Sequence, residues 1–307
     1  MKTLIYSGIL EDYYETGMEG HIILGLYLKQ DKYLEKNLNF DKNNPSKGPE
    51  YWQKLNGFIS LNLGDTIRII DHPTRPDLRG KEFHIGNLEQ SKQDNYRFGR
   101  AYPFESVSIK DWYALFSSEV RAEIHRPIKK VAYFGGTFDP IHKGHLSIIE
   151  HLHHNYDLVI IIPGNNWTKQ KPLFSLNNRI NAVKACCDLF YNVKVLTWAK
   201  RKDTSSTYRV IEEIEEKYGI IPEIVIGSDL VKDLPQWKKW NKLQQYPFII
   251  YPRGEQLGET DLAHIKKYKY LGLITSPDIS STQIRDSRDI SKIPLVAQKF
   301  FKFKNKE

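Results

Sequence analysis

The pattern of hydrophobic and polar residues changes at about residue 127. Before it, short apolar stretches rich in β-branched and aromatic residues are separated by Gly, Asp and Asn, as in "TLIYSGIL", "HIILGLYL", "GFISLNLGDTIRIID" and "EFHIGNL". One helix is expected at "SIKDWYALFSSEV", beginning at Ser108 and followed by a strand, "RAEIHR". This pattern predicts a small β-rich domain over residues 1–126, either a barrel or a roll.

After Pro127, apolar strands alternate with amphipathic helices. The stretches "VAYFG", "DLVIIIPG", "VKVLTW" and "EIVIG" are typical of strands, and "HKGHLSIIEHLHH", "SLNNRINAVKACCDLF" and "SSTYRVIEEIEEKYG" have helical spacing. Strands that are apolar on both faces are typical of a parallel sheet covered by helices on both sides. The expected fold class over residues 127–307 is therefore α/β, a doubly wound parallel sheet.

The net charge differs between these two parts of the chain. The formal charge is +8, yet residues 1–127 carry 17 Lys and Arg against 18 Asp and Glu, so the basic excess lies in the second part. Such a surface suits either nucleic acid or a small polyanion such as a nucleoside triphosphate. The basic residues are scattered, which favours the small polyanion. Binding of nucleic acid would instead weaken steeply with salt.

Composition indicates a globular, cytoplasmic protein. No apolar run approaches the ~20 residues that cross a membrane, so no membrane partner is expected. The N-terminal stretch "MKTLIYSGILED" lacks the features of a secretory signal. Two neighbouring cysteines, Cys186 and Cys187, are poorly placed to bridge to each other and suit a reducing compartment.

The stretch "FGGTFDPIHKGH" carries the strongest chemical signal. It follows an apolar strand, so Gly135 and Gly136 deliver the backbone to the carboxyl edge of the sheet, where such folds bind ligands. Pro140 precedes a helix, and the spacing of His142 and His145 places both imidazoles on one side of its first turn. We expect an anion-binding turn whose histidines donate hydrogen bonds to phosphate oxygens. The alternative is a tight turn with two surface histidines.

This stretch resembles the signature of the HxGH nucleotidyltransferase superfamily, in its nicotinate/nicotinamide mononucleotide adenylyltransferase branch. The resemblance implies a Rossmann-like fold and the transfer of a nucleotidyl group from a nucleoside triphosphate. It implies that His142 and His145 are catalytic and bind ATP. It also implies that the remaining residues of the turn contact ATP, namely Gly135, Gly136, Thr137, Phe138 and Gly144, with Thr137 and Phe138 contacting the mononucleotide too.

A second element, "DISSTQIRD", lies near the end of the same domain. Its serines and threonine are capping-type residues before a short helix, and alone they would indicate an ordinary N-cap. The element resembles the superfamily's ISSTxIR motif. That resemblance implies that Ile279, Ser281, Thr282 and Arg285 bind ATP, with Arg285 also catalytic.

The stretch "VIGSDLVKDLPQWKKWNKL" bears on the acceptor. It looks like the pattern in pyridine mononucleotide adenylyltransferases, which implies that Gly227 and Asp229 line the adenosine pocket and that Trp237 stacks on the pyridine ring. Alternatively Trp237 is a core anchor, although Trp240 could take that role. In "SSTYRVIEEI", Thr207 matches a threonine that hydrogen-bonds the pyridine substituent, but the order of neighbouring residues differs from the usual one.

The loop "PGNNWTKQKPLFSLNNR" departs from the branch. The pyridine enzymes usually have Pro-Pro-His-Lys here, whereas "KPLFSLNNR" resembles phosphopantetheine adenylyltransferase. Lys169, Lys171 and Arg179 are the expected mononucleotide-phosphate partners, with Lys169 also catalytic. Whether Lys169 or Lys171 makes that contact stays open.

Weaker candidates also occur. His151 and His154 have metal-like spacing, but no third ligand is apparent, so a solvated helix end is preferred and no protein-held metal is expected. Tyr13, Tyr14 and Trp52 could form an aromatic recognition face or belong to a β-domain core.

The expected activity joins ATP and nicotinate or nicotinamide mononucleotide, giving the dinucleotide and pyrophosphate in NAD biosynthesis, with Mg²⁺ brought by ATP. The alternatives are a phosphopantetheine adenylyltransferase-like enzyme and a non-catalytic pyridine-dinucleotide sensor. The choice between nicotinate and nicotinamide stays open, as do the role of residues 1–126 and a homo-oligomeric state.

Overall fold

The computed structural model describes residues 2–14, 22–27, 58–60, 64–84, 120–164, 172–188, 190–197, 206–253, 257–271 and 279–303. The chain divides into two compact units, Met1–Ile128 and Lys129–Glu307. The sequence placed this division at Pro127. Each unit is described by itself below.

The first unit contains an antiparallel sheet with the strand order β3-β2-β1-β6-β4-β5. The described strands have β3 and β5 at the two ends of this order, which confirms the predicted β-rich character of this unit, and its closure into a barrel or a roll stays a prediction. Residues 108–119 of the expected helix and Trp52 lie outside the described residues, and Tyr13 and Tyr14 belong to β1. The strands are β1 (Thr3–Tyr14), β2 (Ile22–Tyr27), β3 (Phe58–Ser60), β4 (Thr66–Asp71), β5 (Glu82–His84) and β6 (Arg121–Pro127), with a short 3-10 helix η1 (Pro76–Leu78).

The second unit contains a parallel sheet with the strand order β12-β11-β10-β7-β8-β9. The chain starts at the centre with β7, runs outward to β9, and then crosses to β10 on the other side. The order therefore reverses between β7 and β10, and ligands bind at such a switch point. The strands are β7 (Val131–Gly136), β8 (Leu158–Pro163), β9 (Val193–Val195), β10 (Glu223–Gly227), β11 (Phe248–Tyr251) and β12 (Tyr268–Tyr270).

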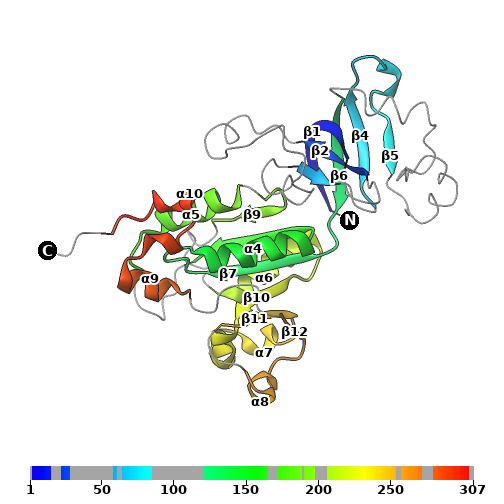
Figure 1. The fold of residues 1–307 in the computed structure, drawn as a ribbon. Coiled ribbons are helices and arrows are strands. Elements are labelled where there is room, and N and C mark those ends of the chain that lie inside the picture. Colours follow the sequence, from blue (N-terminus) through cyan, green and yellow to red (C-terminus); the bar gives the residue numbers. More distant parts are fainter. Residues whose placement is uncertain are drawn as a thin grey trace. The chain divides into compact units, whose positions relative to one another are not determined.

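Helices cover both faces of this parallel sheet (Figure 1). One face packs on a hydrophobic cluster that includes residues of α4, α5 and α10 and alternate strand positions such as Phe134, Val159 and Ile161. The other positions, such as Ile160, are equally buried and face α6. The predicted Rossmann-like α/β fold is confirmed. The helices are α4 (Lys143–Asn155), α5 (Leu176–Cys187), α6 (Thr207–Tyr218), α7 (Trp240–Leu243), α8 (Glu259–Leu262), α9 (Ser281–Ser287) and α10 (Leu295–Gln298), with 3-10 helices η4 (Ser228–Gln236) and η5 (Ile290–Lys292).

Local sequence explains where α6 ends. α6 stops at Gly219, whose φ of +70° is the left-handed conformation that glycine adopts without strain. Cys186 and Cys187 lie buried on α5 as free thiols.

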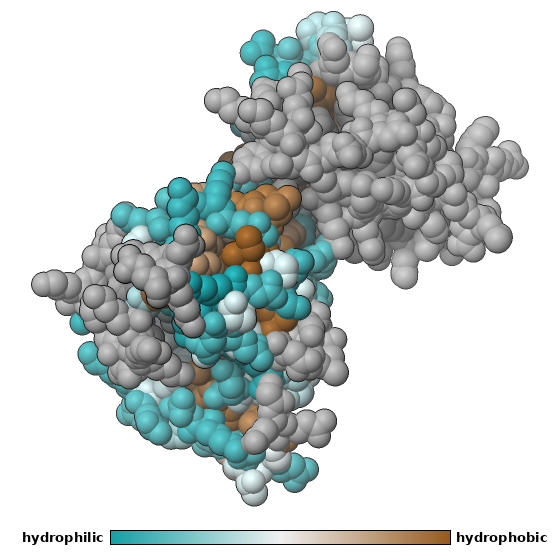
Figure 2. Space-filling model, turned by 60° about the vertical axis from the view of Figure 1, so that its left-hand side comes forward, coloured by the Kyte–Doolittle hydropathy of each residue, from teal (hydrophilic) through white to brown (hydrophobic). Residues whose placement is uncertain are grey.

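In the view of Figure 2, hydrophobic residues of the second unit lie in small areas among hydrophilic ones. None of the helices in the described ranges is both long enough and apolar enough to span a membrane.

Candidate active site

The turn after β7 depends on its two glycines. A Cβ atom on Gly135 would overlap the side-chain hydroxyl of Tyr133, and one on Gly136 would lie 3.0 Å from the ring of Phe138. Phe138 itself has a φ of +49°, which is uncommon for a bulky residue, and its ring is buried. The peptide bond between Asp139 and Pro140 is cis. The close contacts at the two glycines leave no room for larger side chains in this turn, which lies at the carboxyl end of the central strand.

Asp139 ties this turn to the loop before α5. Its carboxylate accepts hydrogen bonds from the backbone N–H groups of Phe174 and Leu173, at 2.9 and 2.8 Å. The side chain is 3% exposed, so water cannot readily replace these bonds.

Arg179 has a different place from the one expected. It is 1% exposed, and its guanidinium donates to the backbone carbonyls of Phe174, Thr137 and Gly164. Three carbonyls that belong to the turn, to the end of β8 and to the next loop therefore hold it. This geometry supports a role for Arg179 in holding the site together. It does not support the expected contact between Arg179 and the mononucleotide phosphate.

The two histidines cap α4 reciprocally. His142 is the N-cap residue, and its Nδ1 accepts from the backbone N–H of His145, while Nδ1 of His145 accepts from the backbone N–H of His142, both at 3.3 Å. The rings stack with their centroids 3.7 Å apart. Since each Nδ1 is an acceptor, each neutral ring carries its hydrogen on Nε2. Among the described residues, the buried Nε2 of His142 has no hydrogen-bond partner.

The surroundings keep both imidazoles neutral. Burial lowers the pKa of His142 to about 3, and the positive charge of Arg253 adds to this effect. Burial also lowers the pKa of His145 well below its usual value, with smaller contributions from His142 and Arg253. Two neutral N–H donors therefore face the switch point, and an anion placed there would stabilise their protonated forms.

The ISSTxIR element packs against the same turn. Ser280 caps α9 together with Gln283, as the sequence predicted. Ser281 donates its hydroxyl to the carbonyl of Pro140 at 2.9 Å. Arg285 donates to the carbonyl of Asp139 at 2.7 Å, lies 3.7 Å from the Asp139 carboxylate, and donates to the Thr282 hydroxyl at 3.1 Å. The two motifs, about 140 residues apart in the chain, thus form one site.

On the other side of the switch point, the loops after β10 and β11 are joined. The Ser228 hydroxyl donates to the carbonyl of Arg253 at 2.8 Å and accepts from its N–H at 2.7 Å. The Arg253 guanidinium lies 3.5 Å from the carboxylate of Asp229. A Cβ on Gly227 would overlap that carboxylate, so a larger residue here would displace the Asp229 side chain from its present position. The sequence analysis missed Arg253, although an arginine directly after an apolar strand of a parallel sheet is a usable signal.

The structure separates the roles of the two tryptophans near η4. Trp240 packs against Phe248 and His264, with ring centroids 5.9 and 5.6 Å apart. These contacts favour Trp240 as the residue that anchors this segment to the fold. Trp237 follows η4, and both tryptophans are only partly buried. Its ring therefore stays a candidate for stacking on a ligand.

The remaining expected residues divide as follows. Gly144 is buried in the first turn of α4, and Ile279 packs against the hydrophobic cluster before α9. Thr207 is the first residue of α6, after the N-cap residue Ser206. Lys169 and Lys171 lie outside the described residues. His151 and His154 belong to no group of three or more potential metal ligands in the part of the chain that the structure describes.

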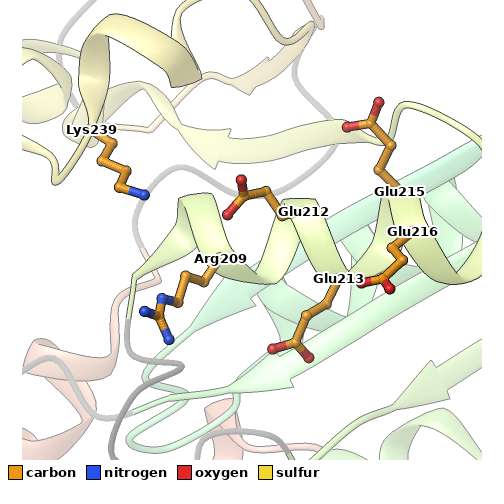
Figure 3. Close-up of a pocket in the computed structure, with 6 residues that line it drawn as sticks. All are labelled: Arg209, Glu212, Glu213, Glu215, Glu216 and Lys239. Carbon is orange, nitrogen blue, oxygen red and sulfur yellow. The ribbon is translucent and has the colours of Figure 1, made fainter.

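A hollow of about 590 Å³ lies elsewhere, between α6 and the residues before α7. Arg209 and four glutamates line it from α6, and Lys239 lines it from the residues before α7 (Figure 3). A surface with four carboxylates repels a triphosphate. This hollow is therefore poorly suited to a triphosphate.

Comparisons with known proteins agree with the motifs. A family model described as "Cytidylyltransferase-like" matches residues 133–287, half of the chain. Two curated relatives, both named "Probable nicotinate-nucleotide adenylyltransferase", come from Acholeplasma laidlawii (29% identity over 50% of this chain and 84% of the relative) and Clostridium novyi (32% over 52% and 86%).

A solved structure is similar in fold. It is the Plasmodium falciparum nicotinic acid mononucleotide adenylyltransferase complexed with NaAD, which has 21% identity and a TM-score of 0.50 and is matched over 94% of its length by 56% of this chain. Since the family model covers half of the chain, including the histidine turn, and the Clostridium relative is 32% identical and matched over 86% of its length, the chain belongs to the cytidylyltransferase-like family, in the branch of the nicotinate-nucleotide adenylyltransferases.

Proposed function

We propose that the second unit transfers an adenylyl group from ATP to nicotinate mononucleotide, releasing pyrophosphate and forming the dinucleotide. The observation that carries this proposal is the stacked pair of imidazoles whose Nδ1 atoms both accept from the backbone, together with the buried Nε2 of His142, which has no hydrogen-bond partner among the described residues. The names of the relatives support nicotinate over nicotinamide as the acceptor.

The reaction needs no protein nucleophile. A phosphate oxygen of the mononucleotide attacks the α-phosphorus of ATP, and the bond from that phosphorus to the bridging oxygen of the β-phosphate breaks, so that pyrophosphate leaves with the electron pair. Nε2–H of His142 and Nε2–H of His145 donate to the phosphate oxygens on which negative charge increases. Donors that are fixed before the reaction stabilise that charge without reorganising.

Cations complete the phosphate site. Arg253 already lies near both imidazoles, since its charge lowers their pKa values, and Arg285 lies at the adjacent turn. Arg285 is held by Asp139, which aims its guanidinium and limits its loss of side-chain entropy on binding. The lysines of the loop after β8, Lys169 and Lys171, are proposed to contact the mononucleotide phosphate.

The acceptor and the adenosine lie on opposite sides of the histidine turn in this proposal. Gly227 and Asp229 contact the adenosine, because the carboxylate is more than a third exposed and can accept from ribose hydroxyls. Trp237 stacks on the pyridine ring, and Thr207 donates to the substituent of that ring. An indole stacked on a heteroaromatic ring contributes about 0.5–1.5 kcal/mol beyond the area it buries.

Mg²⁺ is expected to enter with ATP. The side chains gathered at the turn are imidazoles and guanidiniums, which suit phosphate oxygens, and the Asp139 carboxylate is already taken by two N–H groups and Arg285. Phosphate oxygens and water would therefore supply most ligands of the ion, and its contribution is to neutralise triphosphate charge.

The test is pyrophosphate release from ATP and Mg²⁺ with three acceptors in parallel: nicotinate mononucleotide, nicotinamide mononucleotide and 4′-phosphopantetheine. We expect the highest kcat/KM with nicotinate mononucleotide. Turnover with 4′-phosphopantetheine alone would reject the assigned acceptor and keep the reaction type. No turnover with any acceptor, from protein that binds ATP, would support the sensor instead.

A further inference from the structure

The loops that follow β10 and β11 are joined by a serine that the proposed mechanism does not use. Ser228, directly after β10, is 1% exposed, and its hydroxyl both donates to the carbonyl of Arg253 and accepts from the N–H of that residue, at 2.8 and 2.7 Å. A serine hydroxyl has one hydrogen to donate and lone pairs with which to accept, so both bonds form at once. They fix the backbone of Arg253 on both sides of the Cα atom that carries the guanidinium side chain.

These two bonds begin where the pairing of β10 with β11 ends. The register of the parallel strands pairs Gly227 with Tyr251, the last residue of each strand. Pro252 follows, and it has no N–H group with which to continue the pairing. The Ser228 hydroxyl supplies the next link between the two chain segments. Because it binds only backbone atoms of Arg253, this link does not depend on which side chain residue 253 carries.

The side chain of Arg253 extends from the end of β11 across β10. Its Cδ atom lies 3.4 Å from the position that a Cβ on Gly227 would take. In the sheet, β10 lies between β11 and β7. A side chain that starts after β11 and lies over the end of β10 is therefore directed toward the end of β7, where the histidine turn begins. The lowered pKa of His142, to which the charge of Arg253 contributes, agrees with this direction.

The far end of the Arg253 side chain is held only loosely. Its guanidinium lies 3.5 Å from the Asp229 carboxylate, and both side chains are more than a third exposed. Such an exposed ion pair contributes little, so it does not fix the arginine by itself and can give way to a phosphate. The well-defined constraint on Arg253 is therefore the one that Ser228 places on its backbone.

We propose that Ser228 is a positioning residue, which fixes the backbone of Arg253 and thereby directs its guanidinium across Gly227 to the phosphates of ATP. The inference rests on the proposed function, since that function places the triphosphate at the histidine turn. A guanidinium whose starting point is fixed loses less conformational entropy when it binds phosphate oxygens than one on a loop without this link. Ser228 itself contacts no substrate.

The test is the binding of ATP and of adenosine to Ser228→Ala, measured by titration calorimetry in the presence of Mg²⁺. We expect the Kd for ATP to rise about three- to tenfold, the effect of losing a hydrogen bond of ordinary strength. The Kd for adenosine, which has no phosphate for Arg253 to bind, should stay at the wild-type value. Equal rises for both ligands would mean that Ser228 shapes the adenosine pocket, and would overturn the inference.

Ser147→Ala is the matched control. Ser147 lies on α4, the helix that follows the histidine turn, and its hydroxyl donates to the backbone carbonyl of Lys143 at 3.1 Å. The change removes the same atom from a serine that also binds a backbone carbonyl, but this bond stays within one helix. It should leave the Kd for ATP at the wild-type value. Thermal unfolding of both variants checks that they fold.

A double variant separates positioning of the arginine from packing of the loops. Arg253→Met removes the guanidinium and keeps the N–H and carbonyl groups that Ser228 binds. Alone it should raise the Kd for ATP at least as much as Ser228→Ala does. Adding Ser228→Ala to Arg253→Met should then have no further effect, because the group through which Ser228 acts is already gone. Additive effects would overturn the inference and leave Ser228 a residue that only packs the two loops.

The two proposals fail in different ways. If the wild type binds ATP but releases no pyrophosphate with any acceptor, the proposed function falls, and the comparison of ATP with adenosine still decides the inference. If the wild type turns over nicotinate mononucleotide and Ser228→Ala binds ATP as tightly as the wild type does, only the inference is overturned.

Discussion

At the scale of single residues, the site is built from two neutral imidazoles whose orientation the backbone fixes. Each ring accepts from the N–H of the other histidine, so neither can rotate without losing a helix cap. If both stacked rings were protonated, their positive charges would repel each other across 3.7 Å unless an anion lay between or beside them. In the free protein, the two histidines are therefore neutral hydrogen-bond donors. Their pKa values would rise only when an anion such as a phosphate lies beside them.

His145→Ala should lower kcat about 10²- to 10³-fold, the usual cost of removing one donor that stabilises transition-state charge. Binding of ATP should weaken far less, because the contact strengthens as charge moves toward pyrophosphate. Single-turnover rates and ATP titration of the same protein separate the two effects. Equal losses in turnover and in ATP binding would assign His145 to ground-state binding alone.

The lowered pKa of His142 also makes stability depend on pH. An unfolded His142 takes up a proton near pH 6.5, whereas the folded residue does so only near pH 3. Between these values the unfolded state binds more protons, so the free energy of unfolding falls as pH falls from about 6.5 toward 3. His142→Asn keeps a capping side chain and removes this titration.

We therefore expect urea unfolding at pH 7 and pH 5 to show a smaller loss of stability in His142→Asn than in the wild type. Carboxylates contribute a loss of the same sign in both proteins, so the difference between them isolates the histidine. An identical loss in the two proteins would show that His142 titrates normally in the folded state.

Site residues that belong to a sequence motif could be predicted from the sequence. Residues whose position depends on long-range packing were harder to predict. The histidine turn and the caps of α9 follow from local sequence. Arg179 was assigned to a ligand because an arginine near a phosphate loop suggests it, and only the fold shows three carbonyls around its guanidinium. Arg253 was missed because its partner Asp229 precedes it by 24 residues.

At the scale of elements, Asp139 joins the histidine turn to two other segments. Its carboxylate holds the loop before α5 through two backbone N–H groups and holds α9 through Arg285. Sequence patterns predicted α4, α5, α6 and strands β7 to β10, because periodicity within each segment determines them. They could not predict this connection, since the segments it joins are 34 and 146 residues from Asp139.

Asp139→Ala should reduce the free energy of unfolding by about 2–5 kcal/mol, since it leaves two N–H groups without their acceptor in a buried setting. Asp157→Ala is the matched control. Asp157 also accepts from two backbone N–H groups, those of Lys129 and Lys130, but this contact is exposed, so water can replace the carboxylate. Urea denaturation of both variants measures the difference, and equal losses would mean that burial of Asp139 contributes nothing.

At the scale of the whole molecule, the chain consists of two units of different kind and charge. The β sheet of the first lies in a part of the chain that is close to neutral, and the second carries the basic excess that suits ATP. The relatives align with about half of this chain and with most of their own length. The second unit alone thus corresponds to nearly all of a curated relative.

Residues 129–307 expressed alone should therefore fold and catalyse the proposed reaction. All the described side chains assigned to the site, from Thr137 to Arg285, belong to this unit, as does its hydrophobic cluster. Cooperative thermal unfolding tests the first expectation, and kcat/KM with nicotinate mononucleotide, compared with the full chain, tests the second. A folded fragment with a lower kcat/KM would show that residues 1–128 contribute to substrate binding or catalysis, whereas equal values would assign them a role outside the reaction.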